Sequence, residues 1–299
     1  MMTRDAHTLP RSEGVTRPRD LGTVRLGVID YLNVWPVYEW LLRRERAERR
    51  LPGIATLAGV PAQVNLAMAQ GDLDVSNVSS VAFGEHVRDW LLLPRLSVAA
   101  HGRVDSVLLF SWHADWHDMD GRSIALSEHS ATSIALVRLL CERRYRIQPR
   151  YVLQPPDLDA MLAQHDAALL IGDSALVEGH LRREIAGRGR PYVFDLAAEW
   201  HAWTGLPFVF AVWAARAGRA DAVRASHVVE LLHASKEHGL AHLDRLAGAA
   251  SARFNLPTGV CSEYLQLLDY DLTESDLLGL RRFLELAVPG LRWTDVRFL

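Results

Sequence analysis

The stretch Val24-Arg-Leu-Gly-Val-Ile-Asp-Tyr-Leu-Asn33 has the pattern of a buried β-strand that ends in a polar turn. A helix is expected from about Pro36 to Arg46, because proline suits the first helical turn, where its missing N–H costs nothing. A strand, a polar turn and a helix in this order form the repeating unit of a wound α/β sheet. The sequence therefore predicts an α/β fold that begins at about residue 24.

The same alternation restarts in the middle of the chain. Ser123-Ile-Ala-Leu126 is expected to form a strand, and apolar residues at helical spacing predict a helix from Ala131 to Arg144. Two such sets of strands and helices predict two lobes. Lobe one is expected to comprise residues 24–110 and 207–299, and lobe two residues 111–206.

The C-terminal segment is expected to form about four helices, separated near Gly248, residues 256–257 and Asp271. A purely helical segment needs a sheet to pack on, so the chain is expected to return to lobe one. We therefore predict that two strands, Ser106–Ser111 and Pro207–Trp213, cross between the lobes.

The composition is that of a soluble globular protein with a substantial core. Of 299 residues, 49% are hydrophobic and 23% are charged, and the formal net charge is -3. The chain has no long basic run, so nucleic acid is not an expected partner. No stretch approaches the ~18 apolar residues of a membrane span, so no membrane association is expected.

The cysteines and the N-terminal segment indicate a cellular compartment. Cys141 and Cys261 suggest neither a disulfide framework nor a metal quartet, and a reducing compartment fits them best. Residues 1–23 are polar, contain several arginines and lack the apolar core of a signal peptide. We expect a disordered leader and a cytoplasmic protein.

Four polar turns follow predicted strands, at residues 31–33, 76–80, 127–133 and 171–174. In a wound α/β lobe, ligands bind beyond the carboxyl ends of strands, where helix N-termini direct N–H groups and partial positive charge at anions. Hydroxyl side chains in these turns suit one or two carboxylates of a small molecule. Taken alone, a serine or aspartate at such a turn is more commonly a helix cap, worth about 1 kcal/mol.

Other kinds of site have weaker support. The pairs His113/His117 and His238/His242 have metal-like spacing, but no third ligand at a defined spacing accompanies them, and surface histidines are the better interpretation. The chain contains no phosphate loop and no dinucleotide-binding glycine motif, and its cysteines have no fixed histidine partner. No metal and no cofactor are therefore expected.

Six motifs resemble, in content and order, those of one protein family. They are Arg25-Leu-Gly-Val-Ile-Asp-Tyr-Leu-Asn33 with Pro36, Asn65-x-x-Met-Ala-Gln-Gly-Asp-Leu-Asp-Val-Ser76 with Ser79-Ser80, Gly102-x-Val-x-Ser-Val-Leu-Leu-Phe-Ser111, Ser130-x-Thr-Ser133, Leu170-Ile-Gly-Asp-Ser-Ala-Leu176 and Trp200-x-x-x-Thr-Gly-Leu-Pro-Phe-Val-Phe-Ala-Val-Trp213. The chain resembles the family that contains chorismate dehydratase and dihydroxynaphthoate synthase, both of the futalosine route to menaquinone. The turns 130–133 and 171–174 resemble the dehydratase branch, because the sister enzyme is expected to carry a glycine-threonine turn and a His-Glu pair there.

The resemblance implies a fold, a reaction and a site. The fold is the two-lobed periplasmic-binding-protein type (type II), with two crossing hinge strands and a helical C-terminal tail. The reaction is the dehydration of chorismate to 3-[(1-carboxyvinyl)oxy]benzoate, for which no cofactor is needed and Asn33 is the expected catalytic residue. The residues expected to bind the substrate are Ser79, Ser80, Ser106, Ser130, Thr132, Ser133, Gly172 and Asp173.

Two other functions stay open, and the proton acceptor is a separate question. Dihydroxynaphthoate synthase, or a non-catalytic protein that binds small carboxylates, would suit the same fold, although the leader lacks an export signal. Near the motifs, only His129 and Asp173 offer a base. The enolpyruvyl carboxylate of chorismate is attached through oxygen to the carbon that loses the proton. We therefore expect this carboxylate to act as an intramolecular base.

Overall fold

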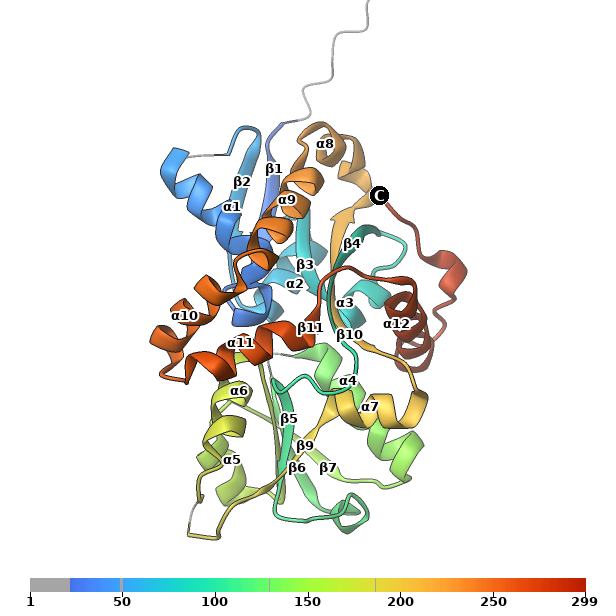
Figure 1. Ribbon diagram of the computed structural model, residues 1–299. Helices are drawn as coiled ribbons and strands as arrows, with labels where there is room; N and C mark the ends of the chain where they lie inside the picture. Colours follow the sequence, from blue (N-terminus) through green and yellow to red (C-terminus); the bar gives the residue numbers. More distant parts are fainter. Residues whose placement is uncertain (1–21, 49–50, 129, 186) are drawn as a thin grey trace, which may run out of the picture.

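The structure is a computed structural model that describes residues 22–48, 51–128, 130–185 and 187–299 (Figure 1). Nearly all of the predicted leader, residues 1–23, lies outside the described residues, as does His129. Two β-sheets lie one above the other in Figure 1, and helices cover both of them. The α/β two-sheet architecture predicted from the sequence is confirmed.

The first sheet has six strands in the order β11-β4-β10-β3-β1-β2. Its strands are β1 (Val24–Val28), β2 (Ile54–Ala58), β3 (Val75–Ser79), β4 (Trp90–Ala100), β10 (Phe208–Arg216) and β11 (Leu268–Asp269). β1 is parallel to β2 and β3, whereas β10 runs antiparallel to β3 and β4. The polar turn after β1 is the short helix η1 (Leu32–Val34), and α1 (Trp35–Glu48) follows it, close to the predicted bounds.

The remaining helices of this part follow the predicted alternation and then the helical tail. They are α2 (Pro61–Gln70), α3 (Ser80–Glu85), η4 (Ala217–Arg219), α8 (Ala220–Ala225), α9 (Val228–Leu240), α10 (Leu243–Phe254), α11 (Thr258–Leu267), α12 (Glu274–Ala287) and η5 (Trp293–Asp295). The helices are interrupted at 255–257 and 268–273, as predicted, but Gly248, where a further separation was predicted, lies inside α10. None of the described helices is long and apolar enough to span a bilayer.

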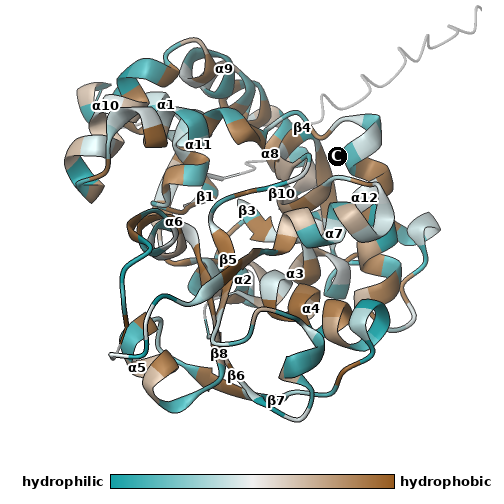
Figure 2. Ribbon diagram, turned by 60° about the horizontal axis from the view of Figure 1, so that its bottom comes forward, coloured by the Kyte–Doolittle hydropathy of each residue, from teal (hydrophilic) through white to brown (hydrophobic). Residues whose placement is uncertain are grey.

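The second sheet has five strands in the order β7-β6-β8-β5-β9. Its strands are β5 (Val107–Ser111), β6 (Ser123–Ser127), β7 (Arg150–Gln154), β8 (Ala167–Ile171) and β9 (Tyr192–Asp195). Its helices are η2 (His117–Met119), α4 (Ala131–Leu139), the π-helical turn η3 (Leu140–Tyr145), α5 (Leu158–Gln164), α6 (Gly172–Leu181) and α7 (Leu196–Thr204). Figure 2 shows that residues of the strands are mostly hydrophobic, as expected for strands covered by helices.

The crossings between the sheets differ in detail from the prediction. Within the described residues, β5 pairs only with strands of the second sheet and β10 only with strands of the first. Neither predicted crossing strand therefore spans both sheets. The chain crosses at residues 101–106 and again between β9 and β10, through α7. The lobe boundaries stay a prediction, although this pairing favours a first boundary before residue 107.

Residues 76–79 were expected to form a polar turn, but they belong to strand β3. Hydrogen-bonded neighbours on both sides, β1 and β10, bury this strand. Ser76 and Asn77 are consequently buried polar residues. Tertiary pairing here overrides the local preference of serine and asparagine for turns.

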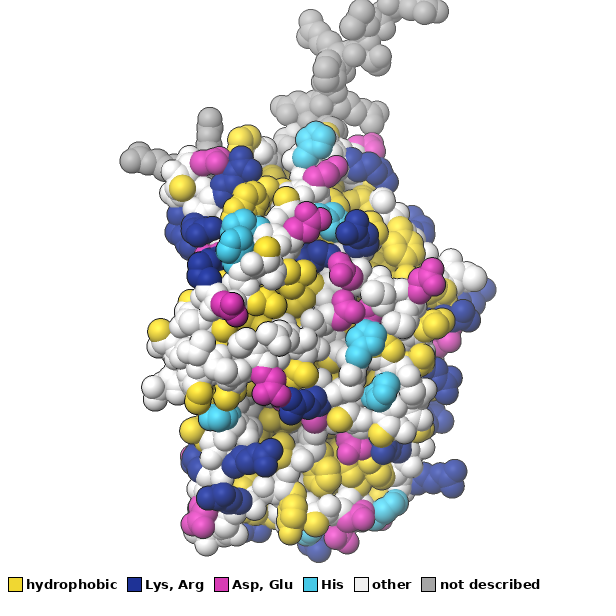
Figure 3. All heavy atoms as spheres, viewed as in Figure 1, with side chains coloured by type: hydrophobic (Ala, Val, Ile, Leu, Met, Phe, Trp, Pro, Cys, Tyr) yellow, Lys and Arg dark blue, Asp and Glu magenta, His cyan; other side chains and the backbone are white. Residues whose placement is uncertain are grey.

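Charged side chains of both signs are interspersed over the face of the molecule in Figure 3. No continuous patch of one sign covers that face, which agrees with the small net charge of -3. This distribution gives no electrostatic footprint for a polyanion on that face.

Candidate active site

A cavity of about 650 Å³, its open mouth included, lies between the two sheets. Ends of strands from both sheets and the start of α4 contribute its lining. Seven of the predicted site residues line it: Asn33, Ser79, Ser106, Ser130, Thr132, Ser133 and Gly172. The cavity size is typical of sites for small molecules, and the structure thus brings together residues up to 139 positions apart in the sequence.

The hydroxyl groups of the cavity are held as hydrogen-bond donors. The Ser79 Oγ accepts hydrogen bonds from Asn65 Nδ2 (3.1 Å) and the Ala82 N–H (3.3 Å). The Ser106 Oγ accepts one from the Tyr264 hydroxyl (3.0 Å). In both serines the oxygen is engaged by other groups, and the hydroxyl hydrogen is left to point elsewhere.

The same pattern recurs at the start of α4. Thr132 Oγ1 accepts a hydrogen bond from the Val81 N–H (3.0 Å), which belongs to the other side of the cavity. Ser130 caps α4 through the Ser133 N–H and donates its own hydrogen to the Ser133 Oγ (2.7 Å). The hydroxyl hydrogens of Thr132 and Ser133 are therefore available to an acceptor, and the cavity offers donors suited to a carboxylate.

Two amide groups in the cavity lack partners among the described residues. Asn33 Oδ1 and Asn77 Nδ2 are buried atoms without a hydrogen bond, and both residues line the cavity. Asn77 is only 3% exposed. Leaving a buried polar group unpaired costs about 1–3 kcal/mol, so such groups in a cavity indicate a ligand that pairs with them.

Gly172 and Asp173 begin α6 opposite the turn after β1. Gly172 has a φ of +63°, and a Cβ at this position would lie 2.9 Å from the Tyr31 ring. Asp173 does not line the cavity: its Oδ1 accepts a hydrogen bond from the Leu32 N–H (3.0 Å), one residue before Asn33. Burial raises the pKa of Asp173 to about 6, and the hydrogen bond from Leu32 opposes this shift. Asp173 thus holds the turn that carries Asn33.

Ser80 is the other predicted residue that the structure places outside the cavity lining. Its Oγ donates a hydrogen bond to the Val209 carbonyl (2.7 Å), and the residue is fully buried. Ser79 is the last residue of β3 and caps α3, whereas Ser80 is the first residue of α3, so their side chains take different directions. Ser79 lines the cavity, while Ser80 joins the start of α3 to β10.

Sequence reasoning missed Asn77 and Tyr264. Asn77 lies within a motif that was noted, but its burial follows from the pairing of β3 on both sides. Tyr264, in the helical tail, reaches Ser106 across 158 positions, and burial raises the pKa of its hydroxyl, which stays a donor. No local pattern identifies either contact.

The described lining contains no Asp, Glu, His, Cys, Lys or Arg side chain. Tyr31 is the one titratable group among the described lining residues. Burial is the main cause that raises the pKa of Tyr31, and the negative charge of the nearby Asp173 raises it further. Neither histidine pair noted in the sequence belongs to a three-ligand cluster within the described ranges. The lining therefore offers hydroxyl and amide groups to a ligand, and no described side chain in it suits a general base.

Comparison with known proteins assigns the chain to a family. The profile of a family described as menaquinone biosynthesis matches residues 24–289. The chain belongs to this menaquinone biosynthesis family. This chain is 35% identical over 274 residues to the chorismate dehydratase of Thermus thermophilus, and the match covers 88% of this chain and 95% of that protein.

Solved structures confirm the fold of this family member. The alkanesulfonate-binding protein of Xanthomonas axonopodis, bound to MOPS, matches with a TM-score of 0.65 at 15% identity, over 95% of this chain and all of that one. The periplasmic aliphatic sulphonate-binding protein of Escherichia coli matches with a TM-score of 0.60 at 16% identity, over 89% and 91% of the two chains. The periplasmic-binding-protein type of fold predicted from the sequence is confirmed.

Proposed function

We propose that this protein is a chorismate dehydratase, a hydro-lyase, and that the cavity between the two sheets is its active site. The observation that carries the proposal is the pair of buried, unpartnered amide groups of Asn33 and Asn77, set among hydroxyl donors. The name of the Thermus thermophilus relative supports the same reaction. Chorismate has two carboxylates, a hydroxyl and an ether oxygen, which match donors and acceptors of this kind.

The start of α4 holds one carboxylate in this proposal. The hydroxyls of Thr132 and Ser133 donate to it, and the N-terminus of the helix adds partial positive charge. Hydrogen bonds to a charged acceptor contribute about 1.5–3 kcal/mol each, so a few of them suffice for a specific site without arginine or lysine.

The reaction removes the ring proton at the ether-bearing carbon and the hydroxyl at the neighbouring carbon, and the ring becomes aromatic. We propose that the enolpyruvyl carboxylate takes the proton and that the departing hydroxide receives it, so that one water leaves for each chorismate. In this proposal Asn33 Oδ1, an unpartnered acceptor, accepts a hydrogen bond from the leaving hydroxyl, or Asn33 Nδ2 donates one to the enolpyruvyl arm and holds it in the reactive rotamer. Such orientation raises the effective concentration of the intramolecular base.

Closure of the site around the substrate is part of the proposal. Two hydrogen bonds join the two sides of the cavity: Val81 N–H to Thr132 Oγ1, and Leu32 N–H to Asp173 Oδ1. Both lie next to predicted substrate-binding residues, so closure excludes water and completes the site at once. A cytoplasmic location, as the sequence predicts, agrees with two cysteines that are free and buried.

Incubation of the purified protein with chorismate tests the proposal directly. We expect chorismate to be consumed and the absorbance of a substituted benzoate to appear, with the Asn33→Ala variant as the inactive control. Binding of chorismate without turnover would instead indicate a non-catalytic carboxylate-binding protein. If the protein neither binds nor converts chorismate, the proposal is refuted, and dihydroxynaphthoate synthase is left as the alternative.

A chorismate analogue esterified at the enolpyruvyl carboxylate tests the proton transfer. We expect the ester to bind weakly and not to dehydrate, because it lacks the proposed base. Dehydration of the ester at a rate near that of chorismate would mean that a protein group accepts the proton.

A further inference from the structure

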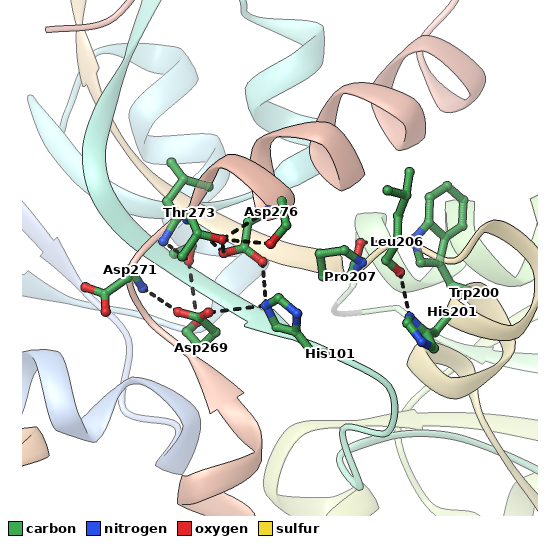
Figure 4. Close-up of polar contacts among 12 residues, drawn as sticks. His101, Trp200, His201, Leu206, Pro207, Asp269, Asp271, Thr273 and Asp276 are labelled. Carbon is green, nitrogen blue, oxygen red and sulfur yellow. Dashed lines mark hydrogen bonds and ion pairs between the residues drawn. The ribbon is translucent and has the colours of Figure 1, made fainter.

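A histidine and two aspartates meet where the chain first crosses between the sheets. His101 directly follows the last residue of β4, Asp269 ends β11, and Asp276 lies in the first turn of α12 (Figure 4). The His101 Nε2 is 3.2 Å from Asp269 Oδ2 and 3.1 Å from Asp276 Oδ1. The sequence predicted no metal site, since these residues are up to 175 positions apart. Within the described ranges, this is the one group of metal-ligating side chains.

Hydrogen bonds orient both carboxylates toward His101. Asp269 Oδ1 accepts from the Asp271 N–H (2.8 Å), and Asp276 Oδ2 accepts from the N–H (2.8 Å) and the hydroxyl (2.7 Å) of Thr273. In each aspartate one oxygen is thus engaged, and the other faces the imidazole. Outer hydrogen bonds of this type fix the ligand carboxylates of metal sites.

Two carboxylates meet one imidazole, so protein groups balance the charge of this cluster at most in part. Asp276 is fully buried, and its Oδ1 has no hydrogen-bond donor. No described lysine or arginine forms an ion pair with Asp269 or Asp276, because the nearby Lys236 pairs with Asp271. A buried carboxylate is costly unless it is paired or coordinates a metal.

We propose that His101, Asp269 and Asp276 bind a divalent transition-metal ion such as Zn²⁺. Two ligand atoms that each lie about 2.1 Å from a metal are about 3.0–3.4 Å apart for angles between 90° and 110°. The two distances from His101 Nε2 fall in this range. An imidazole nitrogen favours transition metals over Mg²⁺ or Ca²⁺, which prefer oxygen ligands. The imidazole is half-exposed, so water completes the coordination.

Bound metal would tie three elements together at the crossing. It joins the end of β4 to β11 and to the start of α12, beside the segment 101–106 that leads into the second sheet. The site is separate from the cavity, whose described lining contains none of the three ligands. Its role is therefore structural, at the base of one connection between the sheets.

The test uses the full-length protein, stripped with chelator and titrated with Zn²⁺ by calorimetry and with Co²⁺ by visible absorption. We expect one ion per chain, the visible bands of cobalt with nitrogen and oxygen ligands, and a rise in Tm of about 5 °C at a hundredfold excess of Zn²⁺ over its Kd. His101→Ala and Asp269→Asn should each weaken binding at least about tenfold. Asp276 is left unchanged, because it also caps α12.

His201→Ala is the matched control, because Figure 4 places this exposed histidine on a neighbouring helix, apart from the two carboxylates. It should bind Zn²⁺ like the wild type. The proposal is overturned if the wild type binds no Zn²⁺, in which case the cluster is an ion triad around a protonated His101. It is equally overturned if His101→Ala and Asp269→Asn both bind Zn²⁺ as tightly as His201→Ala.

Discussion

Replacement of Thr132 by valine tests the binding site most sharply. Thr132 is 2% exposed, and its Oγ1 is the acceptor for the Val81 N–H at 3.0 Å across the cavity. Valine has a similar shape but no hydroxyl, so the variant loses this acceptor and the donor to the substrate carboxylate. In the closed complex the Val81 N–H is then left without a partner, as is a substrate oxygen.

The size of the effect follows from the cost of an unpaired buried group. That cost is about 1–3 kcal/mol, which corresponds to a loss of affinity of about 5- to 150-fold. Titration calorimetry with the reaction product, which does not turn over, measures this loss at fixed pH and salt. Thr132→Ser is the control, because it keeps the hydroxyl and should bind within about threefold of the wild type.

Two results would refute this reasoning. An unchanged affinity of Thr132→Val would place the substrate carboxylate elsewhere. An equal loss in Thr132→Ser and Thr132→Val would show that the hydroxyl is not responsible, because serine keeps it. Urea denaturation of both variants checks that the fold is retained, so that a loss of affinity reports on the site.

Four further predictions concern the turns on the other side of the cavity. Asn33→Ala should lower kcat by at least about 100-fold with little change in KM, and a near-native kcat would make Asn33 a turn former only. Asp173→Asn should lower kcat by less than about 100-fold, whereas collapse of turnover with intact affinity would make Asp173 the base. His129→Ala should have a similarly modest effect, although His129 itself lies outside the described residues. Burial raises the pKa of Asp173 to about 6 in the folded chain. Between about pH 4 and 6 Asp173 is therefore largely protonated in the folded chain and largely ionised in the unfolded chain. The free energy of unfolding of the wild type should therefore fall over this range as pH rises, relative to Asp173→Asn, by about 1 kcal/mol per pH unit in urea titrations, and parallel curves would contradict this. Gly172→Ala should raise KM, because its Cβ would lie 2.9 Å from the Tyr31 ring at a φ of +63°; an unchanged KM would contradict the tight contact.

Local patterns in the sequence predicted the parts of the fold that depend on neighbouring residues. The strand and turn around Asn33, and the capped start of α4 at Ser130, follow from hydrophobic runs and turn residues, and the structure shows both. The strand β11 has two residues and exists only because β4 pairs with it, so no local signal announces it.

The candidate site shows the same limit. Ser79 and Ser80 look equivalent in the sequence, yet the junction between β3 and α3 decides which one lines the cavity. Asn77 is buried by its neighbours in the sheet, and Tyr264 reaches Ser106 from the tail of the chain. Contacts of this kind depend on tertiary pairing, which a single sequence does not display.

The position of β10 between β3 and β4 has a consequence for biosynthesis of the chain. All strands of the second sheet come from one continuous stretch, residues 107–195, whereas the first sheet is completed only by β10 and β11. At ordinary rates of translation the ribosome needs roughly ten seconds to proceed from the end of β4 to the end of β10. During that interval the facing edges of β3 and β4 have no partner, and unpaired edges are sites of misassociation. The nascent chain is thus expected to fold from its middle outward, and nascent chains arrested before β10 should be the ones that chaperones hold.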